Sequence, residues 1–257
     1  MTDSERRAAE NARPERHPEQ GPAEGPERRP ERQSERPRQA PEFADGRAYD
    51  RTDGCPYDAV LCDFDGVVHL WAPDAMSSLD RARGLPEGTM AGAAFRPALL
   101  ELAITGAITD EEWRVRVAAD LAAVCGSTAA TAMVAQWTAG TGRLDPEVLA
   151  LLAAVRSRVP VVLVSNATTR FESYLAAIGL ADAFDAVLNT ARFGAAKPDP
   201  RVYAAAAALA GADPRRCLFV DDTAGHVAAA EAAGMAGLHY TGVDGLRAAL
   251  RATAAPR

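Results

Sequence analysis

Three short apolar runs constrain the fold of this chain more than any other feature of its sequence. They cover residues 59–62, 159–164 and 217–220, and none of them contains a charged side chain. Such runs are typical of strands that are buried on both faces of a parallel sheet. Helical patterns lie between the runs, and this alternation predicts a Rossmann-like, doubly wound α/β fold with a mostly parallel sheet.

Each apolar run is followed by side chains that can take part in chemistry. In chain order these are Asp63 and Asp65, Ser165 and Asn166, and Asp221 and Asp222. Ligands of open α/β sheets bind at the carboxyl ends of the strands, and in a parallel sheet those ends share one edge. We therefore expect the three groups to meet in one site.

The first group favours a metal ion. Strand alternation would separate Asp63 from Asp65, but the strand ends there and Gly66 permits a sharp turn that brings both carboxylates to one site. Two carboxylates held close together repel each other unless a cation lies between them or one of them is protonated. Mg²⁺ is the hard cation that suits such oxygen ligands.

Lys197 is the single lysine among the 28 basic residues of the chain. A surviving lysine in an arginine-rich sequence marks either a chance surface position or a site where the broad guanidinium will not serve. Lys197 precedes a helix and is expected at the same sheet edge as the acids. Together these groups predict a site for phosphate held beside Mg²⁺.

The sequence divides into three parts. Residues 1–56 are rich in Pro, Glu and Arg and offer little apolar surface to bury, so we predict a disordered tail and linker. Residues 57–73 and 142–257 form the α/β core, and residues 74–141 form an all-helical insertion that we interpret as a cap domain. Deletion of residues 1–41 is expected to leave stability and turnover close to unchanged.

Several residues mark helix starts and faces. Asp145 with Pro146 and Asp199 with Pro200 indicate helix starts in the core. Within the insertion, Thr109 and Glu112 form a capping box. We also predict that Thr168 or Thr169 caps a helix after the second strand, and that Arg114 faces solvent.

Composition excludes some classes of function. The formal net charge of -7 does not favour nucleic-acid binding. No apolar run is long enough to predict a membrane span. The four cysteines lack a C-x-x-C spacing, and Cys62 and Cys217 lie in apolar runs and fit buried free thiols, so we expect a cytoplasmic protein. We also expect a monomer or a homodimer.

The ordered motifs resemble those of the haloacid dehalogenase (HAD) superfamily. The matching segments are Asp63-Phe64-Asp65-Gly66-Val67-Val68, Ser165-Asn166, Lys197-Pro198-Asp199-Pro200 and Asp221-Asp222. The resemblance covers about residues 57–257 and implies a HAD core, with the helical insertion similar to a C1 cap. It also implies a Mg²⁺-dependent phosphatase that acts on a small phosphorylated metabolite.

The resemblance implies a role for each motif. Asp63 would be the nucleophile that forms an aspartyl phosphate, and Asp65 would be the general acid and base. Ser165, with backbone N–H groups near Asn166, would bind phosphate oxygens, and Lys197 would neutralise charge. The Asp63 carboxylate, the Asp65 main-chain oxygen and Asp222 would hold Mg²⁺, with Asp221 bound directly or through water.

Three further residues carry weaker expectations. His69 and Trp71 follow the first motif and either contact the substrate or pack against the insertion. His226 stands where the family often has asparagine, although histidine can also donate a hydrogen bond.

Two alternative functions stay open. A β-phosphoglucomutase-like phosphomutase keeps the same motifs, and a catalytically idle regulatory or binding module is expected to have lost an acid or the lysine. A dehalogenase lacks an acid at the position of Asp65, because halide displacement needs no proton on the leaving group.

Overall fold

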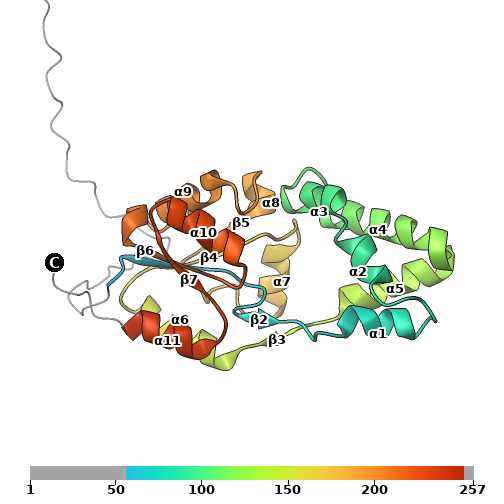
Figure 1. Ribbon diagram of the computed structural model, residues 1–257, viewed down its shortest axis with the longest axis horizontal. Helices are drawn as coiled ribbons and strands as arrows, with labels where there is room; N and C mark the ends of the chain where they lie inside the picture. The colour runs from blue at the N-terminus through green and yellow to red at the C-terminus, as the bar shows by residue number, and fades with distance from the viewer. Residues whose placement is uncertain (1–55, 252–257) are drawn as a thin grey trace, which may run out of the picture. The chain divides into compact units, whose positions relative to one another are not determined.

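The computed structural model describes residues 56–251 of the chain. Five parallel strands form its main sheet in the order β5-β4-β1-β6-β7, with β1 at the centre (Figure 1). These strands are β1 (Ala59–Cys62), β4 (Val161–Ser165), β5 (Ala186–Asn189), β6 (Cys217–Asp221) and β7 (Ala236–His239). The three predicted apolar strands are therefore the three central ones, and the predicted fold class is confirmed.

Helices cover both faces of this sheet. On one face α6 (Pro146–Arg156), α7 (Phe171–Ala177) and α11 (Val243–Arg251) pack on side chains such as Val60 and Leu163. On the other face α9 (Pro200–Leu209) and α10 (Ala224–Ala232) pack on Leu61 and Phe219 (Figure 1). A short helix α8 (Thr190–Phe193) and a 3₁₀ helix η1 (Pro214–Arg216) complete the core.

The predicted helix starts in the core are confirmed. The Asp145 carboxylate accepts hydrogen bonds from the backbone N–H groups of Glu147 and Val148, with Pro146 in the first turn of α6. Asp199 caps α9 in the same way through the N–H group of Arg201. These caps satisfy backbone donors that a helix leaves unpaired at its start.

Five consecutive helices lie between β1 and α6 in sequence. They are α1 (Ala75–Arg81), α2 (Thr89–Ala94), α3 (Pro97–Ile104), α4 (Asp110–Cys125) and α5 (Ser127–Ala139), and no strand interrupts them. The helices share a hydrophobic cluster of their own, centred on residues such as Met90, Val117 and Met133. We call residues 75–139 the helical insertion.

Both reciprocal hydrogen bonds of the predicted capping box are present at the start of α4. The Thr109 hydroxyl accepts from the Glu112 N–H group at 3.1 Å, and the Glu112 carboxylate accepts from the Thr109 N–H group at 2.8 Å.

The two connections between the core and the helical insertion pair with each other. They form the antiparallel strands β2 (His69–Leu70) and β3 (Arg143–Leu144), which make a separate two-stranded sheet. The sequence analysis did not predict this pairing, because two residues are too few to show an alternating pattern.

Two predictions for local structure were wrong. Helix α7 begins at Phe171, and its N-cap position is Arg170 rather than Thr168 or Thr169. Both threonine hydroxyls instead bind Asp110 at the start of α4. Arg114 does not face solvent, because its side chain is only 19% exposed and pairs with Asp110.

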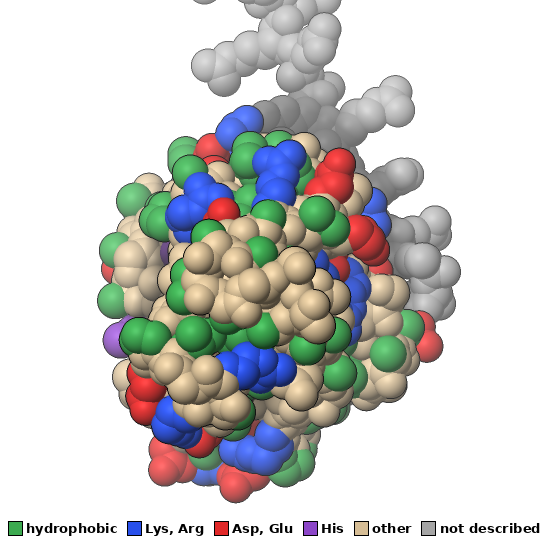
Figure 2. Space-filling model, turned by 90° about the vertical axis from the view of Figure 1, so that its right-hand side faces the viewer, with side chains coloured by type: hydrophobic (Ala, Val, Ile, Leu, Met, Phe, Trp, Pro, Cys, Tyr) green, Lys and Arg blue, Asp and Glu red, His purple; other side chains and the backbone are tan. Residues whose placement is uncertain are grey.

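Other expectations concern the surface and the chain ends. Of the predicted disordered tail and linker (residues 1–56), residues 1–55 lie outside the described residues. Within residues 56–251, no helix combines the length and the apolar composition that a membrane crossing requires. On the face shown in Figure 2, basic and acidic side chains are interspersed and do not gather into one basic patch.

Candidate functional site

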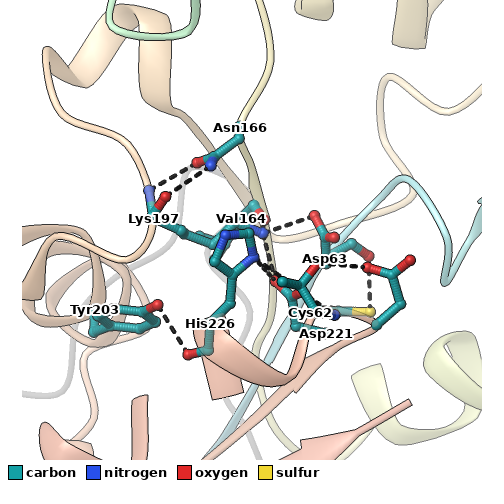
Figure 3. A network of polar contacts seen from close by, with 10 residues as sticks. Cys62, Asp63, Val164, Asn166, Lys197, Tyr203, Asp221 and His226 are labelled. Atoms are coloured by element: carbon teal, nitrogen blue, oxygen red, sulfur yellow. Dashed lines mark hydrogen bonds and ion pairs between the residues drawn. The ribbon is translucent and has the colours of Figure 1, made fainter. Parts of the chain in front are cut away.

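Lys197 lies at the centre of a buried polar cluster at the carboxyl edge of the sheet (Figure 3). Its ammonium nitrogen is 2.8 Å from an Asp63 oxygen and 2.6 Å from an Asp221 oxygen. It also donates a hydrogen bond to the Val164 carbonyl at 3.0 Å. The ends of β1, β4 and β6 therefore converge on one ammonium group, and the expectation that these strand ends meet is confirmed.

Asn166 and His226 hold this cluster in place. The Asn166 side chain accepts a hydrogen bond from the Lys197 N–H group at 2.8 Å and donates one to the Lys197 carbonyl at 2.9 Å. His226 Nδ1 lies 3.1 and 3.2 Å from the two Asp221 oxygens. His226 thus makes a hydrogen bond at this position, as the sequence analysis allowed for a histidine.

The charges in the cluster are strongly coupled. Burial raises the pKa of Asp63 to about 6, even though Lys197 acts in the opposite direction. For Asp221, burial would also raise the pKa, but the hydrogen bond from His226 and the charge of Lys197 outweigh it and the pKa is lowered. Burial would lower the pKa of Lys197, but the charges of Asp63 and Asp221 raise it. Lys197 therefore stays positively charged.

The acids of this cluster fit a divalent cation. Asp63, Asp221 and Asp222 each place a carboxylate oxygen within 4.8 Å of the others. Three ionised carboxylates and one ammonium leave a net charge that a divalent cation neutralises, and all the donors are oxygens, as Mg²⁺ prefers. The Asp65 carboxylate is not a member of this group.

Gly66 is required beside the acidic group. Its φ is +83°, in the left-handed region that favours glycine, and a Cβ atom at this position would overlap the Asp222 carboxylate. Gly66 therefore leaves room for the side chain of Asp222, the exposed acid that follows β6.

Ser165 lies beside the cluster at the end of β4 and is buried. Among the described residues its hydroxyl makes no hydrogen bond, so it is free to donate one to an anion. The Asn166 side chain, by contrast, uses its oxygen and one amide N–H donor on the Lys197 backbone. Its second amide N–H donor and the backbone of residue 166 are left for phosphate binding.

The Asp65 carboxylate belongs to a second hydrogen-bond network, which is separate from the Lys197 cluster. One of its oxygens lies 2.9 Å from His69 Nδ1 and accepts a hydrogen bond from the Trp71 indole N–H group at 2.8 Å. His69 Nε2 lies 2.9 Å from the Tyr174 hydroxyl. The His69 ring is 1% exposed and stacks on Phe64 with a centroid distance of 4.9 Å.

The contacts of His69 with Phe64 and Tyr174 are with the core and not with the helical insertion. Because protein groups engage both of its ring nitrogens and the ring is buried, the geometry favours packing over substrate contact. Trp71 differs, since it is 46% exposed and lines a pocket. The sequence analysis missed Tyr174, because its residue type and position gave no signal of this contact.

A pocket of about 190 Å³ adjoins Asp65 and reaches the helical insertion. Core residues such as Asn166 and Tyr174 form one side of it, and insertion residues such as Trp113 and Arg114 form the other. The sequence analysis did not assign these insertion residues to the site, because helical periodicity alone does not show which face of the insertion meets the core.

Comparison with known proteins places these observations in a family. Residues 57–234 match the family model described as hydrolase, haloacid dehalogenase-like hydrolase. A protein of Mycobacterium tuberculosis named phosphatase MT3486 is 48% identical over 63 residues, which are 24% of this chain and 29% of that relative. The chain thus matches less than a third of that relative's length.

Solved structures share the fold at low sequence identity. A HAD family enzyme of Bacteroides thetaiotaomicron, in complex with magnesium and inorganic phosphate, matches with a TM-score of 0.59 and 19% identity over 71% of this chain and 93% of its own. L-2-haloacid dehalogenase of Xanthobacter autotrophicus matches with a TM-score of 0.51 and 20% identity over 78% and 85%.

Proposed function

This chain belongs to the haloacid dehalogenase-like hydrolases, and from that membership and its site we propose that it is a Mg²⁺-dependent phosphatase of a small phosphorylated metabolite. One observation carries the proposal. Lys197 pairs with Asp63 and Asp221 at one sheet edge, while Asp65 is held separately beside a pocket. The arrangement provides a nucleophile, a fixed positive charge and a proton donor.

The proposed reaction has two steps. An Asp63 oxygen attacks phosphorus while the bond from phosphorus to the leaving oxygen breaks, and Asp65 donates a proton to that oxygen. Asp65 then takes a proton from a water molecule that attacks the phosphorus of the aspartyl phosphate. This second attack releases inorganic phosphate and restores Asp63.

The remaining residues position and neutralise the phosphoryl group. Ser165 and the backbone N–H groups after β4 bind its oxygens, and Lys197 balances the charge on Asp63. Asp63, Asp221, Asp222 and the main-chain oxygen of Asp65 are the proposed ligands of Mg²⁺. When bound, the ion supplies positive charge that stabilises the phosphoryl oxygens.

His69 and Trp71 orient the proton donor in this proposal. Their ring N–H groups are placed to bind one Asp65 oxygen, which leaves the other oxygen for the substrate. The helical insertion acts as the cap that closes over the leaving group. Residues 57–73 and 142–257 form the catalytic core of this scheme.

The acid at position 65 favours a phosphate ester over an alkyl halide as the substrate. Halide departs without a proton, whereas an alkoxide leaving group needs one. The dehalogenase among the structural relatives therefore shows the fold alone. An idle module is disfavoured because Asp63, Asp65, Lys197 and Asp222 are all present.

The test is release of inorganic phosphate from a panel of phosphorylated metabolites, with Mg²⁺ and with EDTA. We expect release that requires the metal and falls at least a thousandfold in Asp63→Asn, because the nucleophile is lost. Asp182→Asn, which changes an exposed aspartate of the core, is the matched control and should retain activity. If folded, Mg²⁺-loaded protein releases no phosphate from any compound, the proposal is wrong.

A further inference from the structure

The pocket beside Asp65 has walls that are unusually aromatic. Six ring side chains line it: Phe64, Trp71, Trp113, Trp137, Phe171 and Tyr174. Leu100 and Ile104 of α3 add aliphatic surface. Because Asp65 also lines the pocket, a leaving group that takes its proton from this acid would extend into aromatic surroundings.

Most polar groups of the pocket are already engaged by the protein. One Asp110 oxygen accepts a hydrogen bond from the Thr168 hydroxyl at 2.7 Å, and the other lies 2.7 Å from Arg114 Nε. The Asn166 side chain is bound to the Lys197 backbone. The pocket therefore has little hydrogen-bonding capacity left for a ligand.

Three polar side chains are exceptions. The Thr138 hydroxyl is buried and has no hydrogen-bond partner within the described residues. Arg170 lies over the Tyr174 ring, 5.7 Å from its centroid, and forms no ion pair with an acid of residues 56–251. Arg114 contacts Asp110 through Nε alone, so its two terminal nitrogens have no partner within the described residues. These groups can serve a few polar atoms of a ligand, whereas the aromatic walls offer no partners to further hydroxyl groups.

We propose that the leaving group of the substrate is a single flat ring, aromatic or heteroaromatic, with few polar substituents. This inference rests on the proposed phosphatase function. A flat ring gains from stacking and edge contacts with the aromatic walls, worth about 0.5–1.5 kcal/mol per pair beyond area burial. A polyol would lose hydration at several hydroxyls without recovering the hydrogen bonds.

The size of the pocket agrees with one ring. An apolar cavity of about 150 Å³ holds benzene. The present volume of about 190 Å³ allows a slightly larger group, such as a ring with a short linking carbon. The pocket composition also disfavours the phosphomutase alternative, because a reorienting sugar phosphate needs hydrogen-bond partners for its hydroxyl groups.

Three primary alkyl phosphates test the proposal with similar leaving-group chemistry: benzyl phosphate, cyclohexylmethyl phosphate and glucose 6-phosphate. We expect kcat/KM for benzyl phosphate to exceed that for glucose 6-phosphate by about tenfold or more, with cyclohexylmethyl phosphate between them. An equal or higher value for glucose 6-phosphate would overturn the flat-ring proposal while leaving the phosphatase function intact. If the protein hydrolyses none of these three compounds and no other phosphorylated metabolite, the flat-ring proposal and the phosphatase proposal are both wrong.

Variants of the pocket provide the second arm. Trp137→Leu and Trp71→Leu should each reduce the ratio of benzyl to glucose phosphate activity several-fold. The ratio cancels any common loss from a disturbed Asp65 or from partial unfolding. Phe193→Ala removes a ring that is 40% exposed and outside the pocket, and it should leave the ratio unchanged. Unchanged ratios in both tryptophan variants would contradict the inference.

Discussion

Asp63, the proposed nucleophile, illustrates at the residue scale how a buried carboxylate costs stability. Its carboxylate is buried, and burial raises its pKa from 3.8 to about 6. A raised pKa means that the folded chain binds this proton more tightly than the unfolded chain. Stability therefore falls as pH rises from about 4 to about 6, and the full cost of the ionised group is present above pH 6.

Asp63→Asn should consequently stabilise the metal-free protein at pH 7. We expect a higher free energy of unfolding than wild type in EDTA, with the difference shrinking as pH falls toward 4. Lys197 keeps Asp221 as a partner at 2.6 Å in this variant. Urea unfolding between pH 4 and pH 7 is the measurement. A variant less stable than wild type at pH 7 would refute this argument.

The matched control is Asp222→Asn. This carboxylate belongs to the same acidic group but is exposed, so its replacement relieves much less desolvation. The stability gain should be smaller than for Asp63→Asn.

Individual residues were predictable from the sequence where a motif ties a residue type to a strand end. Asp63, Asp221 and Lys197 meet as expected because the carboxyl ends of parallel strands share one edge. The contact between His69 and Tyr174 was not predictable, since it joins residues 105 positions apart and depends on how α7 packs.

At the scale of an element, helix α4 also has one feature that could be predicted from the sequence and one that could not. Its start was predicted from the capping box, which is a contact between neighbours in sequence. Its attachment to the core was not. Thr168 and Thr169 have the composition of helix caps, but Asp110 competes for their hydroxyls from a distance of 58 and 59 residues in the chain. Tertiary contacts overrode the local signal.

Thr168→Val tests whether this attachment supports the site. The change removes the hydrogen bond to a buried Asp110 oxygen, and we expect the free energy of unfolding to fall by about 1–3 kcal/mol. KM should rise, because Thr168 and Asp110 both line the pocket. Thermal unfolding and steady-state kinetics measure the two effects.

Thr105→Val is the control for side-chain shape in that experiment. Its hydroxyl bonds only to the Glu101 carbonyl of its own helix, at 2.6 Å on the exposed side of α3. The control should change stability and KM little. Equal effects of the two substitutions would show that the attachment of α4 has no special role.

At the scale of the whole molecule, the paired connections β2 and β3 link the core, the helical insertion and Asp65, the proposed proton donor. The three central strands of the main sheet were predictable because each is an uninterrupted apolar run. The pairing of β2 with β3 was not, yet it places Gly142 against His69. The two connections between the core and the helical insertion therefore meet at His69, the residue that contacts the Asp65 carboxylate.

Gly142→Ala should disturb this position without touching the substrate. A Cβ atom at residue 142 would overlap the His69 ring, so we expect His69 to shift and Asp65 to lose its fixed orientation. Proton donation matters most for poor leaving groups. The variant should therefore lose activity at least tenfold on benzyl phosphate but much less on 4-nitrophenyl phosphate, whose leaving group departs without a proton.

His69→Gln and Gly92→Ala complete this experiment. His69→Gln removes the ring that supports Asp65 and should show the same dependence on the leaving group as Gly142→Ala. Gly92 lies in α2 with nothing within 4 Å of an added Cβ atom, so Gly92→Ala should behave as wild type. Equal losses on both substrates in the Gly142 and His69 variants would mean that the connections support the fold alone. A loss of activity on benzyl phosphate alone would instead show that the connections between the core and the helical insertion keep the Asp65 carboxylate in its orientation.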